Sequence, residues 1–392
     1  MKGDAAPSSD AAPPPAPAAK ALDKRPGTTS AGIALNNLNA DINARLAHLD
    51  KPRRGEKLGL VELLLDRSHY LGTIADLEQA EKLTRASDAD AGPRDAGEAD
   101  AEEHFARAVV ANALHRFDEA LRELDAATQA GMPVARIHGT RASVFMARGQ
   151  YDDALALQLP SIESQGSMPI TTAAVLANRM QKPMAESERL FDLARDRFND
   201  VSAFALAWMD FQRGSVLELD GDDKRARLWF AEAVDVLPQY AHAAVHLAPS
   251  EPPADAIKLL ETVKATSDDP EVLAALAAAH KRAGHTAEEG PLLEQARKRY
   301  DEIVAKYPEA FADHAARFWL NAGNDPKKAL VLARLNAKNR NTEEALDLWM
   351  ATAAGAKDNA EVCLAVRAMA ALKYLSARRR ALVTASLAKC PD

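Results

Sequence analysis

The sequence predicts an all-α fold built from repeated helix pairs, and three observations support this prediction. Apolar residues make up 47% of the 392 positions but aromatic residues only 5%, and small, strong helix formers in such a proportion favour closely packed helices over sheets. The motif FDEAL at 117–121 recurs as YDDAL at 151–155, 34 positions further on. Apolar and polar residues do not alternate in the way that indicates a strand.

The first 33 residues are predicted to be a disordered tether. Residues 1–26 are rich in Pro, Ala and Ser, a composition that does not form a core. Such a start is typical of the mature end of an exported bacterial protein or lipoprotein whose leader was removed, and the alternative is a disordered cytosolic tail. We slightly favour the periplasmic or secreted location over the cytoplasmic one. No run of about 18 apolar residues is available to span a membrane.

Residues 34–100 are predicted to form helical pairs that cap the N-terminal end. An apolar stripe at spacings of three and four runs from Leu35 to Leu49 and indicates a helix of about four turns. Further helices are expected at 57–68 and at 74–85. The acidic stretch 87–100, which contains Gly and Pro, is interpreted as a long loop.

The stretch 211–238 is the clearest helix pair in the sequence. Small residues stand where the two helices must touch, Gly214 on the first helix and Ala226 and Ala233 on the second. Phe230 is expected to fill the interior between the two alanines. A pair of this kind is hydrophobic on two sides and needs neighbouring pairs to bury both.

Weaker pairs continue the array over 101–340, and residues 341–392 are predicted to form a C-terminal helical cap. The expected helices are 171–181, 185–198, 240–248, 254–265, 271–283, 287–307, 309–321, 326–337, 341–354, 360–373 and 377–389. Asp325 followed by Pro326 is a strong signal for a helix start, and Asn341 with Glu344 has the spacing of a capping box.

A 34-residue period of helix, turn and helix resembles the tetratricopeptide repeat (TPR) family, in a degenerate form of bacterial type. The family's small residue on the first helix corresponds to Ala108, Ala142 and Gly214, its alanine early in the second helix to Ala120, Ala154 and Ala226, and its closing proline to Pro238. Arg107 and Arg141 depart from the pattern, because the family prefers leucine there. The resemblance implies a right-handed α-solenoid of about eight helix pairs, whose first helices line a concave groove.

The resemblance also implies a non-enzymatic scaffold or adaptor that binds a peptide or a segment of a protein partner in this groove. The family's register places in the groove Phe105, Val109, Asn112, Ser143, Met146, Trp208, Phe211, Ser215 and Glu218. Trp208 and Phe211 are candidates for anchoring an apolar side chain of a ligand, although such residues more often pack against the preceding repeat. The family's two-carboxylate-clamp pattern is not matched. The first alternative, motivated by the tether, is an exported or lipid-tethered assembly factor of the cell envelope.

Cys363 and Cys390 are the only two cysteines, and both belong to the last predicted hairpin. Antiparallel helices bring positions at similar distances from their turn to similar heights, so a disulfide is compatible with this geometry. In an oxidising compartment it would stabilise the cap by roughly 3–4 kcal/mol. The alternative is two unrelated thiols. Neither cysteine has a CxxC partner or a neighbouring His, which argues against a metal or redox site.

His242 and His246 stand four positions apart, a spacing that lets two imidazoles share a metal on one helix face. A metal-binding helical protein is therefore the second alternative, but the run HAAVH lacks the glutamate of HExxH and no third ligand is evident, so we expect packed or rim histidines. No phosphate loop, dinucleotide fingerprint or nucleophile elbow occurs, so we expect neither catalysis nor a cofactor. The net charge of −8 argues against a general nucleic-acid binder.

Overall fold

The computed structural model describes residues 25–49, 55–85, 98–164 and 166–390, and every regular element in these residues is a helix. The helices are α2 (Ala31–Leu46), α3 (Glu56–Leu71), α4 (Ile74–Arg85), α5 (Glu98–Ala113), α6 (Phe117–Gln129), α7 (Val134–Ala147), α8 (Tyr151–Glu163), α9 (Ser167–Arg179), α10 (Met184–Asp196), α11 (Ala203–Asp220), α12 (Asp223–Val236), α13 (Ala241–Leu247), the 3-10 helix η2 (Ala248–Ser250), α14 (Pro253–Lys264), α15 (Pro270–Ala283), α16 (Thr286–Lys306), α17 (Pro308–Leu320), α18 (Pro326–Asn339), α19 (Glu343–Gly355), α20 (Asn359–Ala370) and α21 (Ala377–Leu387).

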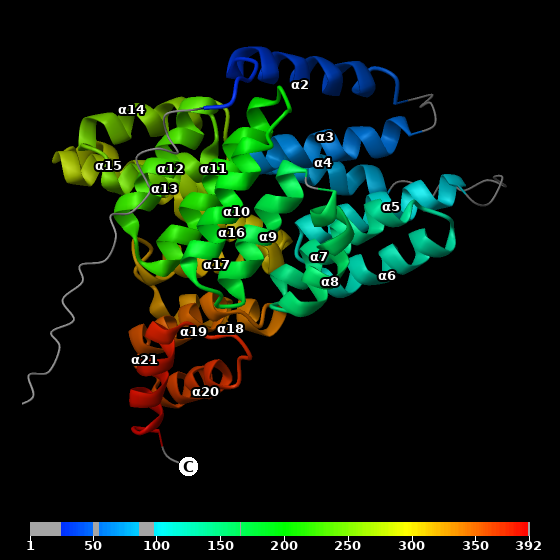
Figure 1. Cartoon of the computed structure of the whole chain (residues 1–392). Helices are drawn as coiled ribbons and strands as arrows, with labels where there is room; N and C mark the ends of the chain where they lie inside the picture. Colours follow the sequence, from blue (N-terminus) through cyan, green and yellow to red (C-terminus); the bar gives the residue numbers. More distant parts are fainter. Residues whose placement is uncertain (1–24, 50–54, 86–97, 165, 391–392) are drawn as a thin grey trace, which may run out of the picture.

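Consecutive helices pack against each other as pairs, from α3 with α4 to α19 with α20. The described residues thus hold nine pairs, close to the eight or so predicted, with α2 and α21 added at the two ends. The pairs stack one after another into an all-α solenoid (Figure 1), so the predicted fold class is confirmed. Within the described ranges, no helix combines the length and the apolar character needed to cross a membrane.

The pair α11 and α12 shows why the sequence folds as closely packed helices. Gly214 faces the ring of Phe230, and a Cβ added at Gly214 would lie 2.6 Å from that ring. Phe230, Ala226 and Ala233 are all buried. Gly214 thus lies where the two helices touch and Phe230 fills the interior, as predicted, and this packing depends on the missing side chain of the glycine.

Side-chain caps and left-handed glycines set many of the helix ends. The Oδ1 of Asp325 accepts a hydrogen bond from the backbone amide of Lys328 at 3.0 Å and opens α18, as its position before a proline predicts. Gly221 and Gly284 follow α11 and α15 with φ of 86° and 78°, a conformation that costs a glycine little.

The predicted capping box of Asn341 and Glu344 is wrong. Helix α19 begins at Glu343, and its cap is Thr342, whose Oγ1 accepts a hydrogen bond from the backbone amide of Ala345 at 3.3 Å. Thr342 takes this role because its hydroxyl stands three residues before that free amide. Glu344 instead forms a salt bridge with Arg179, the last residue of α9.

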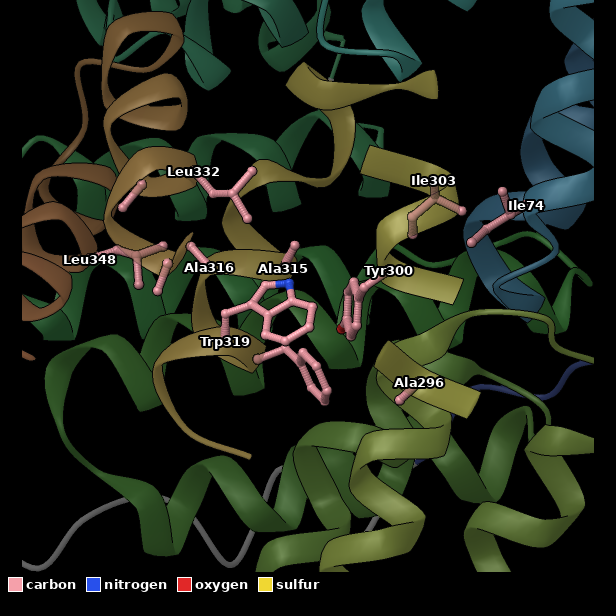
Figure 2. Close-up of a cluster of buried hydrophobic side chains, with 12 residues drawn as sticks. Ile74, Ala296, Tyr300, Ile303, Ala315, Ala316, Trp319, Leu332 and Leu348 are labelled. Atoms are coloured by element: carbon pink, nitrogen blue, oxygen red, sulfur yellow. The ribbon is translucent and has the colours of Figure 1, made fainter. Parts of the chain in front are cut away.

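The solenoid coils back on itself, so that its C-terminal half packs against its N-terminal half. Figure 2 shows one core cluster in which Ile74 from α4 lies beside Ile303 of α16, in the same cluster as Tyr300. The Nδ2 of Asn339, at the end of α18, donates a hydrogen bond to the backbone oxygen of His115 at 2.8 Å. The concave side, predicted to be an open groove, is therefore partly filled by the chain's own helices.

The predicted N-terminal boundaries fall partly outside the described residues. Of the tether, residues 1–24 lie outside them, whereas Arg25 forms salt bridges with Glu232 at 3.0 Å and Asp235 at 2.5 Å on α12. Of the loop at 87–100, residues 87–97 lie outside as well. Helix α5 already begins at Glu98, so the predicted boundary at position 100 falls inside a helix.

Candidate functional site

A cavity of about 310 Å³ lies where the two halves of the solenoid meet. Most of its lining comes from α3, α5, α7, α13 and α17, the first helices of five pairs. The polar residues among the lining are Ser68, His69, Asn112, His115, Ser143, His242, Asp269 and His314. His69 is surrounded by protein and still accessible to solvent, because the cavity lies in front of it.

His314 is part of the cavity wall and lies between two carboxylates. Its Nδ1 is 3.0 Å from Oε2 of Glu271, and its Nε2 is 3.8 Å from Oδ1 of Asp313. The Glu271 carboxylate raises the pKa of His314 to about 10 against the opposing effect of burial, so this imidazole is a cation at neutral pH. Burial alone would raise the pKa of Glu271, but His314 outweighs it and lowers that pKa to about 2.

Arg340 links the connection between α18 and α19 to the turn after α5. Its Nη2 lies 2.9 Å from Nδ1 of His115, and its Nη1 lies 3.4 Å from Oδ2 of Asp313. Burial lowers the pKa of His115 to about 3, and the guanidinium acts in the same direction. His115 is therefore a neutral acceptor, while Arg340 and His314 both hold the pKa of Asp313 well below its usual value against the effect of burial.

His69 and His242 are two further neutral imidazoles of the cavity wall, and they lie next to each other. Their ring centroids are 6.1 Å apart, and the hydroxyl of Tyr240 lies 3.5 Å from Nε2 of His69. Burial lowers the pKa of His69 to about 4 and that of His242 to about 3. A neutral imidazole presents one nitrogen as a hydrogen-bond acceptor, so this wall can accept hydrogen bonds from a ligand.

Asp269 brings a carboxylate to the cavity at the start of α15. Its Oδ1 accepts a hydrogen bond from the backbone amide of Glu271 at 2.8 Å, which makes it the N-cap of the helix. Burial raises the pKa of Asp269 to about 6, and the neighbouring Glu271 carboxylate adds to this effect. Asp269 is thus much less compensated by positive charge than Glu271 or Asp313.

Two of the nine predicted groove residues line the cavity. Asn112 and Ser143 both belong to the lining, and Nδ2 of Asn112 donates a hydrogen bond to Oγ of Ser143 at 3.3 Å. Phe211 packs beside the cavity, with its ring centroid 6.3 Å from that of His242 and 5.2 Å from that of Tyr240. Phe211 thus supports the wall from behind.

The other apolar residues that were predicted to line the groove lie between helices. Phe105 is 3% exposed and lies under the guanidinium of Arg136. Val109, Met146 and Trp208 pack against hydrophobic clusters. Ser215 donates its hydroxyl hydrogen to the backbone oxygen of Phe211 in its own helix, at 3.0 Å. The candidate site is therefore the cavity, rather than the surface around Trp208 and Phe211.

His242 and His246, the two histidines considered as a metal pair, lie next to different carboxylates. The Nδ1 of His242 lies 3.9 Å from Glu271, whereas the Nδ1 of His246 lies 2.9 Å from Oε2 of Glu218, the last of the predicted groove residues. The part of the chain that the structure describes holds no group of three or more His, Cys, Asp or Glu side chains placed to bind a metal. The metal-binding alternative gains no support from this arrangement.

Four site residues were missed by sequence reasoning: His69, His115, Asp269 and His314. The three histidines carry no motif or periodicity that marks a site. Asp269 precedes Pro270, which indicates a helix start but not a ligand site. Only the coiling of the solenoid brings them to one cavity. The one available signal was that two of them, His69 and His314, stand on first helices, which face inward in a solenoid.

Comparison with known proteins finds no matching family model and no matching curated protein. Similar solved structures include the human IFIT1 dimer with PPP-AAAA, at 15% identity and a TM-score of 0.43 over 90% of this chain and 84% of that chain. The APC/C hetero-tetramer Cut9–Hcn1 is similar at 11% identity and a TM-score of 0.42 over 86% and 63%. Yeast Tom70 is similar at 12% identity and a TM-score of 0.37 over 95% and 96%. Similarity this low carries no argument about what this chain binds.

Proposed function

We propose that this chain is a non-enzymatic helical-repeat scaffold that binds a segment of a protein partner, and that the segment inserts a group into the central cavity. The observation that carries this proposal is the convergence of polar side chains from five first helices on one cavity of about 310 Å³. A cavity of that size accepts a side chain or a chain end rather than a whole helix. The partner is therefore anchored at one point, and the remaining contacts are made outside.

The protonation states of His314 and His69 favour recognition over proton transfer by these two imidazoles. General acid–base catalysis is most efficient when the pKa of the catalytic group lies near the working pH. His314 is held as a cation with a pKa of about 10, and His69 is held neutral with a pKa of about 4. Neither imidazole is suited to exchange a proton readily at neutral pH, whereas fixed donors and acceptors suit recognition.

Site-specific photo-crosslinking tests this function. A diazirine-bearing amino acid is introduced at position 143, inside the cavity, and in a control protein at Ala135, which lies on the same helix α7 but is exposed and does not line the cavity. After irradiation in an extract, cross-linked peptides are mapped by mass spectrometry. We expect one defined partner segment to be attached at position 143 and not at position 135.

A matched pair of substitutions provides the second arm. Ala147→Trp fills the cavity from the same helix, whereas Ala135→Trp adds an equal side chain at the exposed position. We expect Ala147→Trp to abolish the cross-link at position 143 and Ala135→Trp to leave it unchanged, with both proteins shown to be folded by circular dichroism. Equal labelling at positions 143 and 135, or a cross-link that survives Ala147→Trp, contradicts the proposal.

A further inference from the structure

We propose that the group accepted by the central cavity is a primary ammonium, from a lysine side chain or an amino terminus, and that it pairs with the carboxylate of Asp269. This inference rests on the proposed function and names the chemistry of the segment that enters. The titratable groups lining the cavity are His69, His115, His242, His314 and Asp269. Their charges and their existing hydrogen bonds decide what fits.

The balance of charge around the cavity leaves one carboxylate in excess. Glu271 is paired with the His314 cation at 3.0 Å. Asp313 is paired with Arg340 at 3.4 Å. His69, His115 and His242 are held neutral by burial.

Asp269 therefore has no ion pair of its own among the described residues that line or adjoin the cavity. It shares the attraction of the His314 cation with Glu271 and Asp313, so the three carboxylates keep one negative charge in excess. The neighbouring Asp268 does not change this balance, because its Oδ2 pairs with Arg299 at 2.6 Å. A carboxylate held in a confined space gains most from a ligand that brings the opposite charge, because screening by bulk water is weak there.

The geometry of Asp269 favours an ammonium over a guanidinium. Its Oδ1 already accepts a hydrogen bond from the backbone amide of Glu271 at 2.8 Å, so fewer acceptor positions of the carboxylate remain for a ligand. A guanidinium binds best through two parallel hydrogen bonds to both oxygens, whereas an ammonium needs only one. The three ammonium hydrogens can then be shared with the hydroxyl of Ser68 or Ser143 and a neutral imidazole of the wall.

Three short peptides measure this preference on the full chain. Ac-Ala-Lys-Ala-NH2 carries a side-chain ammonium only, Ala-Ala-Ala-NH2 carries a terminal ammonium only, and Ac-Ala-Ala-Ala-NH2 carries neither. Binding is followed by chemical-shift changes of the protein in a titration. We expect at least one ammonium peptide to bind at least tenfold more tightly than the uncharged peptide, and the better of the two identifies the source of the ammonium.

Asp269→Asn is the decisive variant, because asparagine keeps the N-cap and the shape while it removes the charge. We expect it to weaken binding of the preferred ammonium peptide at least fivefold. Asp255→Asn is the control at an exposed carboxylate in the first turn of α14, outside the cavity lining, and it should leave the affinity within twofold. Equal affinity of Asp269→Asn and the unmodified protein, or no difference among the three peptides, overturns the inference.

The two proposals fail in different ways. If Asp269→Asn leaves the partner cross-link at position 143 intact and the peptides show no preference, the scaffold function stands and the ammonium inference falls. If the ammonium peptides bind through Asp269 but position 143 captures no defined partner segment, the cavity is an amine site and the scaffold function falls.

Discussion

Tyr307 donates its hydroxyl hydrogen to Oε2 of Glu81 at 2.9 Å, although 226 positions separate the two residues in the sequence. Tyr307 links α16 to α17 in the C-terminal half, and Glu81 belongs to α4 in the N-terminal half. Both side chains are buried, so this contact fixes the position of one half against the other. This contact helps to hold the two halves together, and the central cavity lies where they meet.

Tyr307→Phe should lower the free energy of unfolding by about 1–2 kcal/mol, because it removes a buried hydrogen bond to a charged group. Glu81 keeps a salt bridge with Arg116 at 2.7 Å, so the loss should not be larger. Urea denaturation followed by circular dichroism measures the change. Tyr374→Phe is the matched control, since it removes an exposed hydrogen bond to Asp152 and should cost less than about 0.5 kcal/mol. Equal losses in the two variants would contradict a special role for Tyr307.

Much of the fold could be predicted from the sequence, because a helix pair is specified by residues close together in the chain. The contact of Gly214 with Phe230 follows from small and large residues at helical spacing within 16 positions. The inward position of Asn112 and Ser143 follows from the repeat register. The meeting of Glu81 with Tyr307 could not be predicted, because it depends on small rotations between pairs that accumulate along the solenoid.

Gly214→Ala should destabilise the protein by about 1–3 kcal/mol, because the new methyl group would overlap the ring of Phe230 and force a buried side chain to shift. Gly139→Ala is a matched control in helix α7, since a Cβ there meets no atom within 4 Å. The control should be neutral or more stable by up to about 1 kcal/mol, because alanine favours a helix over glycine. Thermal and urea unfolding measure the change in the free energy of unfolding for each variant and show whether it is a loss or a gain. A stable Gly214→Ala protein would mean that α11 and α12 can separate without cost.

Acid should weaken the closed solenoid through the neutral histidines. Burial lowers the pKa of His69 to about 4, and it lowers the pKa of His115 and His242 to about 3, from 6.5 in the unfolded chain. Between about pH 6.5 and 4 the unfolded chain therefore binds more protons, and these groups lower the free energy of unfolding as the pH falls. His242→Asn should reduce the slope of unfolding free energy against pH by up to about one proton in this window.

His314 should have the opposite effect on the pH dependence of stability, because it stabilises the folded protein at lower pH. Its pKa is raised to about 10 by Glu271, so its contribution to stability is complete below about pH 6.5 and is lost as the pH rises through 10. His314→Asn should therefore remove the loss of stability on the alkaline side. It should also reduce part of the acid slope, because the His314 cation helps to lower the pKa of His115 and His242. Urea unfolding across the pH range compares both variants with the unmodified protein. Identical slopes for all three proteins would show that the cavity histidines do not control the pH dependence.

The disulfide between Cys363 and Cys390 closes a loop with a sequence separation of 27 and ties the end of the chain to α20. Helix α21 has a single fully buried side chain, Val383, so its own packing holds it only weakly in place. Replacing both cysteines with serine should destabilise the C-terminal cap by roughly 3–4 kcal/mol through the entropy regained by the unfolded loop. Because few contacts join α21 to the rest, we expect local opening rather than global unfolding. Amide hydrogen exchange should therefore accelerate in α21 while the amides of α11 and α12 keep their protection, and unchanged exchange in α21 would show that packing alone holds the cap.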